Sequence, residues 1–320
     1  MILTFTPNPS VDRTVFIDAL DRGTVIRSRR SRLEPSGKGV NVALALHRHG
    51  HAVAAVLPLG GTGGSSLRQM LNAVSLDIRT VPVDGELRTN VSLVEPDGTV
   101  TKVNEAGPEL TAAEVQELVD TVSHSLVDVT WLACCGSLPK GAPVDLYARV
   151  AELASARGVR VAVDSSGLAL RHSLAGKPDL IKPNLHELAE LVGESLRRVG
   201  DVIDAARQVR SQGVSAVLVT LGADGALLVD DSGATQVEAS VRTVASTVGA
   251  GDAALAGYLS VGGTGRTALE ATVSWASIAV QHEGTLFDAP DVDRPVKRAA
   301  AADRARTWRE PVDGPEPRFV

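Results

Sequence analysis

Along most of this chain, short apolar runs rich in β-branched residues alternate with longer segments whose apolar residues recur at helical spacing. The runs are apolar at nearly every position, so both faces of each expected strand must be buried. Strands of this kind occur in parallel sheets that helices cover on both sides. The sequence therefore predicts an α/β fold in which a mostly parallel central sheet lies between two layers of helices.

At 320 residues the chain is long enough for one large α/β domain or two small ones. The expected strands span residues 2–5, 53–57, 129–135, 159–163, 180–182 and 216–220. The expected helices span about residues 40–49, 65–74, 111–124, 143–157, 184–193 and 201–212. No internal repeat is visible, and a single domain is expected over about residues 1–290.

Two segments, about 11–34 and 86–105, break this rhythm because apolar and polar side chains alternate in them with no helix between. Asp97-Gly98 is a hairpin signal inside the second segment. We predict a small antiparallel sheet that projects from the core as a lid. Its apolar residues need a second surface, and a partner's identical lid in a homodimer is the expected cover. The residues concerned include Val15, Ile17, Val91 and Leu93.

The last segment, residues 291–320, differs from the rest in composition. It begins with a basic, alanine-rich stretch, and it ends in a tail that contains Pro311, Gly314, Pro315 and Pro317. The first part is expected to be a helix. Proline and glycine so near a chain end predict a frayed tail after it.

Composition argues against several partners. Aromatic residues make up 3% of the chain and the net charge is -6, which disfavours a base-stacking platform or a surface that neutralises nucleic-acid phosphates. No apolar stretch is long enough to span a membrane, and no signal peptide is visible after Met1. Cys134 and Cys135 are neighbours inside an apolar run and are expected to be buried and reduced. We therefore expect a cytoplasmic protein without nucleic-acid or membrane partners.

Candidate functional residues follow the expected strands. In an open parallel sheet, ligands bind outside the carboxyl ends of the strands, so polar residues at these positions should converge on one rim. Those residues are Asn8, Asp12, Ser137, Asp164, Lys182 and Asn184, and we expect them to converge with Asp252.

The turn Gly249-Ala250-Gly251 leads into Asp252 and then into a run of small apolar residues. Such a turn can point backbone N–H groups at an anion, and the start of the following helix also favours negative charge. Asp252 beside it could accept a proton from an attacking hydroxyl. That combination suits phosphoryl transfer to an alcohol. The alternative is a glycine-rich helix start with a capping Asp.

Other motifs also allow both a functional and a purely structural interpretation. Gly37-Lys38-Gly39 enters a helix, and Lys38 could hold a phosphate or simply be an exposed lysine; the spacing is not that of a Walker A loop. Asn184 and Glu187 share a helix face, where they suit magnesium-bound water or a helix cap. Arg88, at the start of the second lid segment, is either a ligand contact or a solvated surface residue.

Taken in order, these motifs resemble the ribokinase-type, or PfkB, family of sugar kinases, and within it the 1-phosphofructokinase and tagatose-6-phosphate kinase group. The resemblance rests on residues 6–12, 37–43, 85–90, 104–108, 136–139, 182–187 and 248–252. The family implies a three-layer ribokinase-like sandwich with a β-sheet lid that often doubles as a dimer interface. It also implies ATP as co-substrate and Mg²⁺ as cofactor. This chain departs from the family pattern at Ser36, where glycine is usual, and at Cys135, where serine is usual.

The resemblance also assigns roles by position. Sugar binding is implied for Asp12, Gly37, Lys38 and Asn41. Contact with the phosphate already on the substrate is implied for Arg88, Asn90 and Ser137, and a contact with the neighbouring subunit's phosphate for Arg27. Nucleotide contacts are implied for Lys182, Asn184, Thr220, Gly222 and Gly225, and a water-mediated magnesium contact for Asn184 and Glu187. The anion hole is implied at Gly249, Ala250 and Gly251, and the catalytic base at Asp252.

The expected activity is therefore ATP-dependent phosphorylation of a ketohexose monophosphate, fructose 1-phosphate to fructose 1,6-bisphosphate. Tagatose 6-phosphate or fructose 6-phosphate is the alternative acceptor, because the site chemistry would be the same. A non-catalytic sugar-phosphate sensor is the rival from another class. Asp252 argues against the sensor, since binding without turnover needs no base.

Overall fold

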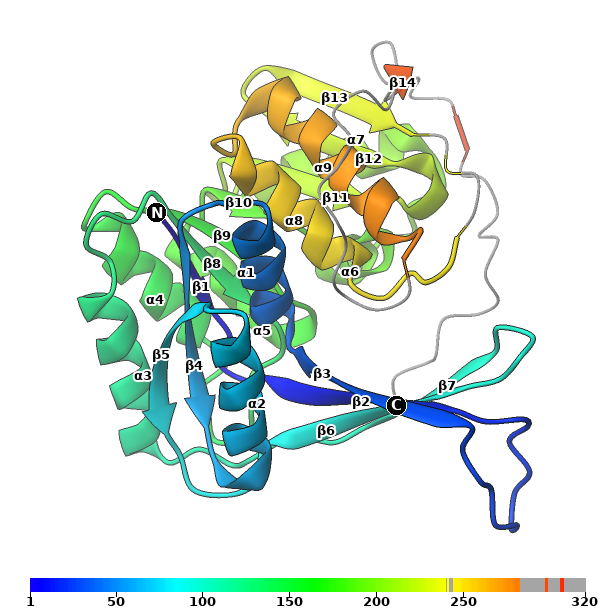
Figure 1. Cartoon of the computed structure of the whole chain (residues 1–320). Coiled ribbons are helices and arrows are strands. Elements are labelled where there is room, and N and C mark those ends of the chain that lie inside the picture. Colours follow the sequence, from blue (N-terminus) through cyan, green and yellow to red (C-terminus); the bar gives the residue numbers. More distant parts are fainter. Residues whose placement is uncertain (240, 242–243, 283–296, 299–305, 308–320) are drawn as a thin grey trace.

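The computed structural model describes residues 1–239, 241, 244–282, 297–298 and 306–307 (Figure 1). Its central sheet has ten strands in the order β14-β13-β12-β11-β10-β9-β8-β1-β4-β5. The parallel strands are β1 (Ile2–Phe5), β4 (Val53–Leu59), β5 (Asp77–Pro82), β8 (Trp131–Cys135), β9 (Arg160–Asp164), β10 (Leu180–Ile181) and β11 (Ala216–Thr220). The antiparallel edge is formed by β12 (Ala226–Asp230), β13 (Gly233–Glu238) and β14 (Lys297–Arg298).

Helices cover both faces of this sheet (Figure 1). One layer consists of α3 (Ala112–His124), α4 (Leu146–Ser155), α5 (Gly167–Ser173), α6 (Leu185–Val192) and α7 (Val199–Arg210). The other consists of α1 (Lys38–Arg48), α2 (Gly61–Ala73), α8 (Ala250–Ser260) and α9 (Gly265–Ala279). Alternate residues of each strand enter opposite cores: Leu3 and Phe5 pack with the first layer, and Ile2 packs with the second. The predicted three-layer α/β sandwich is confirmed.

The lid is a separate four-stranded sheet in the order β3-β2-β6-β7. Its strands are β2 (Ser10–Phe16), β3 (Arg30–Ser36), β6 (Arg88–Val94) and β7 (Val100–Asn104). The lid was expected to be antiparallel, and its outer pairs are, but the central pair β2–β6 is parallel. The reason is that β2 follows β1 and β6 follows β5. Because β1 and β5 are parallel strands of one sheet, both chain segments leave the core at the same edge and in the same direction.

The two faces of the lid differ in character. Asp12 and Asn90 are register partners on one face, whereas Val15 and Leu93 are partners on the other. The apolar face packs on α2 near the core, where Val11 is buried. The expectation that Ile17 needs a second surface was wrong, because Ile17 is 3% exposed within this chain alone.

The bounds of some observed elements match the prediction, and other observed elements were not predicted. Strands 2–5 and 216–220 were predicted with their observed bounds, whereas β5, β12, β13, α5 and α9 were not among the expected elements. Helix α2 begins at Gly61 instead of about residue 65, because Glu86 accepts hydrogen bonds from the backbone N–H groups of Thr62 and Gly63. No helix within the described ranges is long and apolar enough to cross a membrane.

The predicted helix and frayed tail of residues 291–320 fall mostly outside the described residues. Within that segment, Lys297–Arg298 form β14 instead of part of a helix, and Arg306 and Thr307 are described in contact with the body of the protein.

Candidate active site

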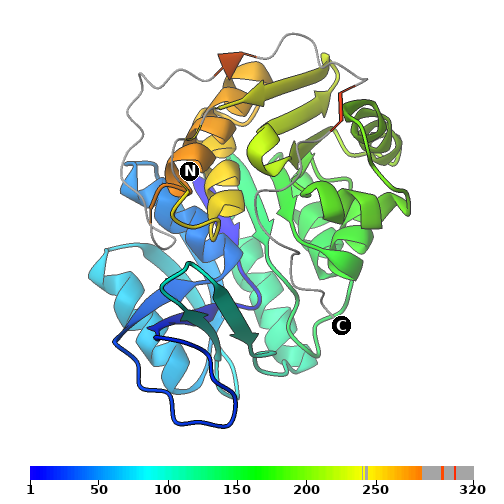
Figure 2. The ribbon, with the colours of Figure 1, turned by 90° about the vertical axis from the view of Figure 1, so that its right-hand side faces the viewer.

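The candidate site lies at the carboxyl ends of the central strands, at the edge of the sheet from which the lid projects (Figures 1 and 2). Asp164 is the last residue of β9, and Lys182 follows β10 directly. Helices α1 and α8 begin at this edge, and they pack against each other. Strand order thus brings together side chains that are far apart in the sequence. This is the arrangement expected at the carboxyl ends of the strands in an open parallel sheet.

Asp252 lies in the first turn of α8 and is 8% exposed. The turn before it is possible because Gly249, the N-cap, has φ 80°, which favours glycine. Asn41 on α1 donates a hydrogen bond from Nδ2 to Asp252 Oδ2 at 2.7 Å. Burial, reinforced by the negative charge of Asp164, raises the pKa of Asp252 to about 6, although Lys38 and the Asn41 hydrogen bond oppose the shift. A carboxyl group with such a pKa can both accept and release a proton near neutral pH.

Asp164 is fully buried and pairs with two lysines at once. Lys38 Nζ lies 2.8 Å from Asp164 Oδ1, and Lys182 Nζ lies 2.9 Å from Oδ2. Burial alone would raise the pKa of Asp164, but the two ammonium groups lower it below its ordinary value. The carboxylate therefore fixes both cations beside Asp252. Asp164 was predicted to lie on this rim, but no role was predicted for it.

The two lysines face different parts of the site. A Cβ atom added to Gly251 would lie 3.4 Å from Lys182 Nζ, so this ammonium group sits against the glycine turn that begins α8. Burial alone would lower the pKa of Lys38, but Asp164, Glu187 and Asp252 raise it well above its ordinary value. Lys38 therefore stays charged. The site has fixed positive charge beside helix N–H groups that have no carbonyl of their own helix to bond.

Asn184 and Glu187 form a reciprocal helix cap at the start of α6. Glu187 N–H donates to Asn184 Oδ1 and Asn184 N–H donates to Glu187 Oε2, both at 2.8 Å. The capping alternative is thus present in the structure, and the other carboxylate oxygen, Oε1, lies 3.7 Å from Lys38 Nζ. Among the described residues, no group of three or more His, Cys, Asp or Glu could hold a metal ion by itself.

On the lid, the side chains of Arg88 and Asn90 are held by hydrogen bonds. Arg88 donates to the backbone carbonyls of Asn8, at 2.9 Å, and of Pro9, at 3.4 Å. Asn90 Nδ2 donates to Asp12 Oδ1 at 2.9 Å and to Ser10 Oγ at 3.0 Å. The Arg88 bonds join the lid to the segment between β1 and β2, and the Asn90 bonds join β6 to β2 within the lid.

Asn8 bridges the lid and the core. Its Nδ2 donates to Ser137 Oγ at 3.2 Å and to the carbonyl of Ala106 at 3.4 Å. The side-chain oxygens of Asn8, Asn41 and Asn90 are buried and have no hydrogen-bond partner in the described part of the chain. In each case the amide nitrogen already donates to a protein oxygen, so the amide oxygen is left to accept. These three amide oxygens are therefore buried acceptors without a donor among the described residues.

Gly37 lies beside this group, at the N-cap of α1. It has φ 115°, and an added Cβ would lie 3.0 Å from Pro9 Cα, so only glycine fits there. The preceding Ser36 is buried in β3, without the positive φ that would favour the family's usual glycine. Cys135 is buried at the end of β8, as expected.

The predicted nucleotide loop follows β11. Thr220 N–H donates to the carbonyl of Pro183, and Thr220 forms a parallel bridge with Asn184, so the loop lies next to the α6 cap. Gly222 and Gly225 have φ 56° and 81°. A Cβ on Gly225 would lie 2.1 Å from the carbonyl oxygen of Val237, so the loop packs closely on β13.

Arg27 is the predicted site residue that the structure places elsewhere. It is exposed in the loop between β2 and β3, at the end of the lid that points away from the core (Figure 1). Its expected role toward a neighbouring subunit stays a prediction.

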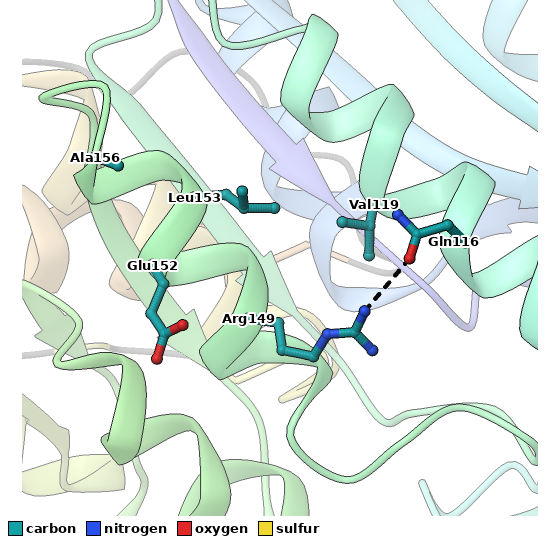
Figure 3. A pocket seen from close by; sticks show the side chains of 6 residues that line it. All are labelled: Gln116, Val119, Arg149, Glu152, Leu153 and Ala156. Carbon is teal, nitrogen blue, oxygen red and sulfur yellow. Dashed lines mark hydrogen bonds between the residues drawn. The ribbon is translucent and has the colours of Figure 1, made fainter.

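A surface pocket between α3 and α4 lies outside this site (Figure 3). Arg149 crosses it to donate a hydrogen bond to Gln116 Oε1 at 3.4 Å. None of the predicted site residues lines this pocket, whose walls are Gln116, Val119, Arg149, Glu152, Leu153 and Ala156.

A buried carboxylate beside a helix start and two fixed lysines is the arrangement of a phosphotransferase that acts on an alcohol. The family model of the pfkB carbohydrate kinases matches residues 6–292. The chain belongs to this family, and it is a phosphotransferase with an alcohol acceptor.

The curated relatives include 1-phosphofructokinases from several organisms. The chain is 38% identical over 260 residues to that of Rhodobacter capsulatus, which covers 81% of this chain and 82% of the relative. It is 37% identical over 297 residues to that of Haloferax volcanii, which covers 92% and 94%.

Solved structures show the same fold. Phosphofructokinase-2 from Escherichia coli in complex with potassium matches with a TM-score of 0.84 and 31% identity, over 91% of this chain and 96% of that one. A possible 1-phosphofructokinase from Thermotoga maritima matches with a TM-score of 0.82 and 26% identity, over 94% and 100%.

Proposed function

We propose that this carbohydrate kinase transfers the γ-phosphoryl group of ATP to fructose 1-phosphate and makes fructose 1,6-bisphosphate. The observation that carries the chemistry is Asp252, which is buried, hydrogen-bonded to Asn41 and shifted to a pKa of about 6 beside the glycine turn of α8. The choice of acceptor is supported by the 1-phosphofructokinases among the relatives.

In this proposal Asp252 accepts the proton of the substrate hydroxyl as its oxygen attacks the γ-phosphorus. The bond from the γ-phosphorus to the bridging oxygen breaks, and ADP leaves. The N–H groups of Gly249, Ala250 and Gly251 and the ammonium group of Lys182 stabilise the charge on the moving phosphoryl group.

Magnesium fits next to the α6 cap. Mg²⁺ in kinase sites keeps several waters and takes one or two carboxylates, and Glu187 Oε1 is the oxygen that the cap leaves over. Glu187 and Asn184 would hold the ion through water, and its charge would offset that of the nucleotide phosphates. Thr220, Gly222 and Gly225 would contact the nucleotide itself.

The proposal that the site binds a sugar is supported by its buried acceptors that lack a donor in the described part of the structure. Asn8, Asn41 and Asn90 each present a buried amide oxygen without a partner in the described ranges, and a buried acceptor of this kind is stabilised when a hydroxyl donates to it. A polyhydroxy substrate supplies several such donors. Asp12, Gly37 and Lys38 line the same region, and Arg88 with Ser137 would bind the phosphate that the substrate already carries.

The test is a coupled assay of ATP consumption with four acceptors at equal concentration: fructose 1-phosphate, fructose 6-phosphate, tagatose 6-phosphate and fructose. We expect the highest kcat/KM with fructose 1-phosphate and the lowest with fructose, which lacks the anion for Arg88. A preference for another acceptor would overturn the proposed substrate. Binding of sugar phosphate without ATP consumption would favour a sensor.

Fructose 6-phosphate is the second candidate acceptor. Escherichia coli phosphofructokinase-2, whose structure in complex with fructose 6-phosphate matches this chain with a TM-score of 0.81, is 30% identical to it over 88% of this chain and 93% of that one. The same assay separates the two candidates, because they differ only in which carbon carries the phosphate.

We also propose that the lid forms a homodimer interface. Leu33, Arg13, Val91 and Val103 form one row across its apolar face, and Leu33 is 48% exposed. Two such faces can cover each other in a twofold contact. Light scattering at micromolar concentration, with and without sugar phosphate, is expected to give the mass of a dimer; a monomer under both conditions would contradict this.

A further inference from the structure

Arg306 and Thr307 are fixed against the body of the protein although they lie beyond residues 6–292, the part that matches the family model. The carbonyl oxygen of Arg306 accepts a hydrogen bond of 3.0 Å from Val199 N–H, at the start of α7. Thr307 forms an antiparallel bridge with Arg198. The backbone here is therefore held in register with the main fold.

The guanidinium group of Arg306 lies between two carboxylates. Its Nη2 lies 2.6 Å from Asp224 Oδ1, and its Nη1 pairs with Glu238 Oε1. The Asp224 side chain is 3% exposed, and that of Arg306 is 28% exposed. An ion pair on the surface contributes little to stability. A buried carboxylate that loses its cation, however, lowers stability strongly. Arg306 thus belongs to the structure around Asp224.

Asp224 belongs to the loop that follows β11. It lies between Gly222 and Gly225, in a short 3₁₀ turn. Gln236 on β13 donates a hydrogen bond to the Asp224 carbonyl at 3.1 Å, and Glu238 on the same strand is the second partner of Arg306. One guanidinium group therefore ties the loop to β13 and, through the Arg306 backbone, to α7.

We propose that Arg306 is a positioning residue for the nucleotide, acting by holding the 222–225 loop in its binding conformation. This inference rests on the proposed function, in which Gly222 and Gly225 contact ATP. Both glycines have positive φ, and a glycine loses more conformational freedom on ordering than any other residue does. Without Arg306 the nucleotide itself would have to order the loop, and its affinity would fall by that cost.

The first test compares Arg306→Ala with wild type in steady-state kinetics. We expect KM for ATP to rise about tenfold, the scale of one charge-assisted contact, while KM for the sugar phosphate and kcat at saturating ATP change by less than about twofold. Arg306→Lys keeps the charge and should restore part of the loss. Equal changes in both KM values, or none, would overturn the proposal.

The matched control is Arg210→Ala. Arg210 also pairs with a carboxylate, that of Asp231, and donates to the carbonyls of Ser215 and Asp230, but it lies away from the nucleotide loop. Its loss should lower stability without a selective effect on KM for ATP. If Arg210→Ala raised KM for ATP as much as Arg306→Ala did, general destabilisation would explain both and the proposal would fail.

A measurement without nucleotide separates this inference from the proposed function. Hydrogen exchange of the backbone amides of residues 222–225 should be faster in Arg306→Ala than in wild type with no ATP present. If wild type showed no ATP-dependent turnover, the proposed function would fail. If wild type used ATP but loop exchange and KM for ATP were unchanged in Arg306→Ala, only the role of Arg306 would fail.

Discussion

Asp252 and Arg88 are both placed at the candidate site, but the regions that hold them are built differently. Asp252 belongs to the site floor, which we define as Asn41, Asp252, Asp164, Lys38 and Lys182. These residues come from α1, α8, β9 and the end of β10, and all but Lys38 are buried. Arg88 belongs to lid strand β6, whose side chains are only partly buried, and it bonds to the backbone carbonyls of Asn8 and Pro9.

The difference separates two tasks. In the floor, Asp164 holds two lysines in place, and burial together with the charge of Asp164 raises the pKa of Asp252. Such an arrangement is rigid, because moving one charge leaves its partner buried and unpaired. The lid can change residues without disturbing that balance. We therefore expect the floor to govern the rate of the chemical step and the lid to govern which phosphosugar binds.

The largest expected effect is that of Asp252→Asn. Removing the base should lower kcat by about 10²–10⁴-fold, while binding of the sugar phosphate measured by calorimetry stays close to that of wild type. The amide keeps the size of the side chain, so the fold should be unchanged by circular dichroism. A variant that kept more than about a tenth of wild-type kcat would show that Asp252 is not the base.

The same substitution in the core and on the lid should have very different effects on stability. Leu132→Ala in β8, where the side chain is fully buried, should lower the free energy of unfolding by about 2–5 kcal/mol. Leu33→Ala on the exposed lid face should change it by less than about 0.5 kcal/mol. Urea titration of dilute, monomeric protein measures both. A large loss at Leu33 would mean that the lid contributes to the core after all.

Arg88→Ala tests the lid's part in substrate choice. Loss of a charge-assisted contact should raise KM for the sugar phosphate by about 10- to 100-fold and leave KM for ATP nearly unchanged. Arg79→Ala is the matched control, because Arg79 also donates to a backbone carbonyl, that of Ser125, outside the site. Equal effects of Arg88→Ala on both substrates would assign Arg88 to lid folding instead.

The pH dependence of kcat should show the smallest of these effects near neutrality. Asp252 must be ionised to act as base, and its pKa is raised to about 6, so kcat should fall about tenfold per pH unit below that value. A phosphate monoester also titrates near pH 6, so Asp252→Asn serves as the control that shows the substrate's step alone. Identical pH profiles of kcat for wild type and Asp252→Asn would show that Asp252 is not the group whose titration limits kcat.

Much of the core could be predicted because its pattern is local. Residues 2–5 and 216–220 are apolar at nearly every position, so both faces of each strand must be buried. The lid strands were also visible from alternation, and Asp97-Gly98 marked the turn between β6 and β7. The parallel pairing of β2 with β6 could not be predicted, because it depends on where β1 and β5 end in the same sheet.

The site was predictable as a set of residues but not as a set of contacts. The turn at Gly249 indicated where Asp252 would lie, since a helix start after such a turn is a local feature. The pairing of Asp164 with Lys38 and Lys182 depends on three elements that meet only in the folded sheet. Arg306 had no motif around it, and its contacts with Asp224 are visible only in the structure.

The parallel pair β2–β6 also has a consequence for the order in which the molecule folds. Ser10 and Arg88 become neighbours only after α1, β4, α2 and β5 have been laid down between them. Pairings between distant segments form slowly, because closing a long loop costs entropy before any contact is gained. We expect pulse-labelled refolding to protect the amides that join β4 to β5 before those that join β2 to β6. The lid would then be completed only after the strands between its two halves have paired, so phosphosugar selectivity would lag behind the assembly of that part of the core.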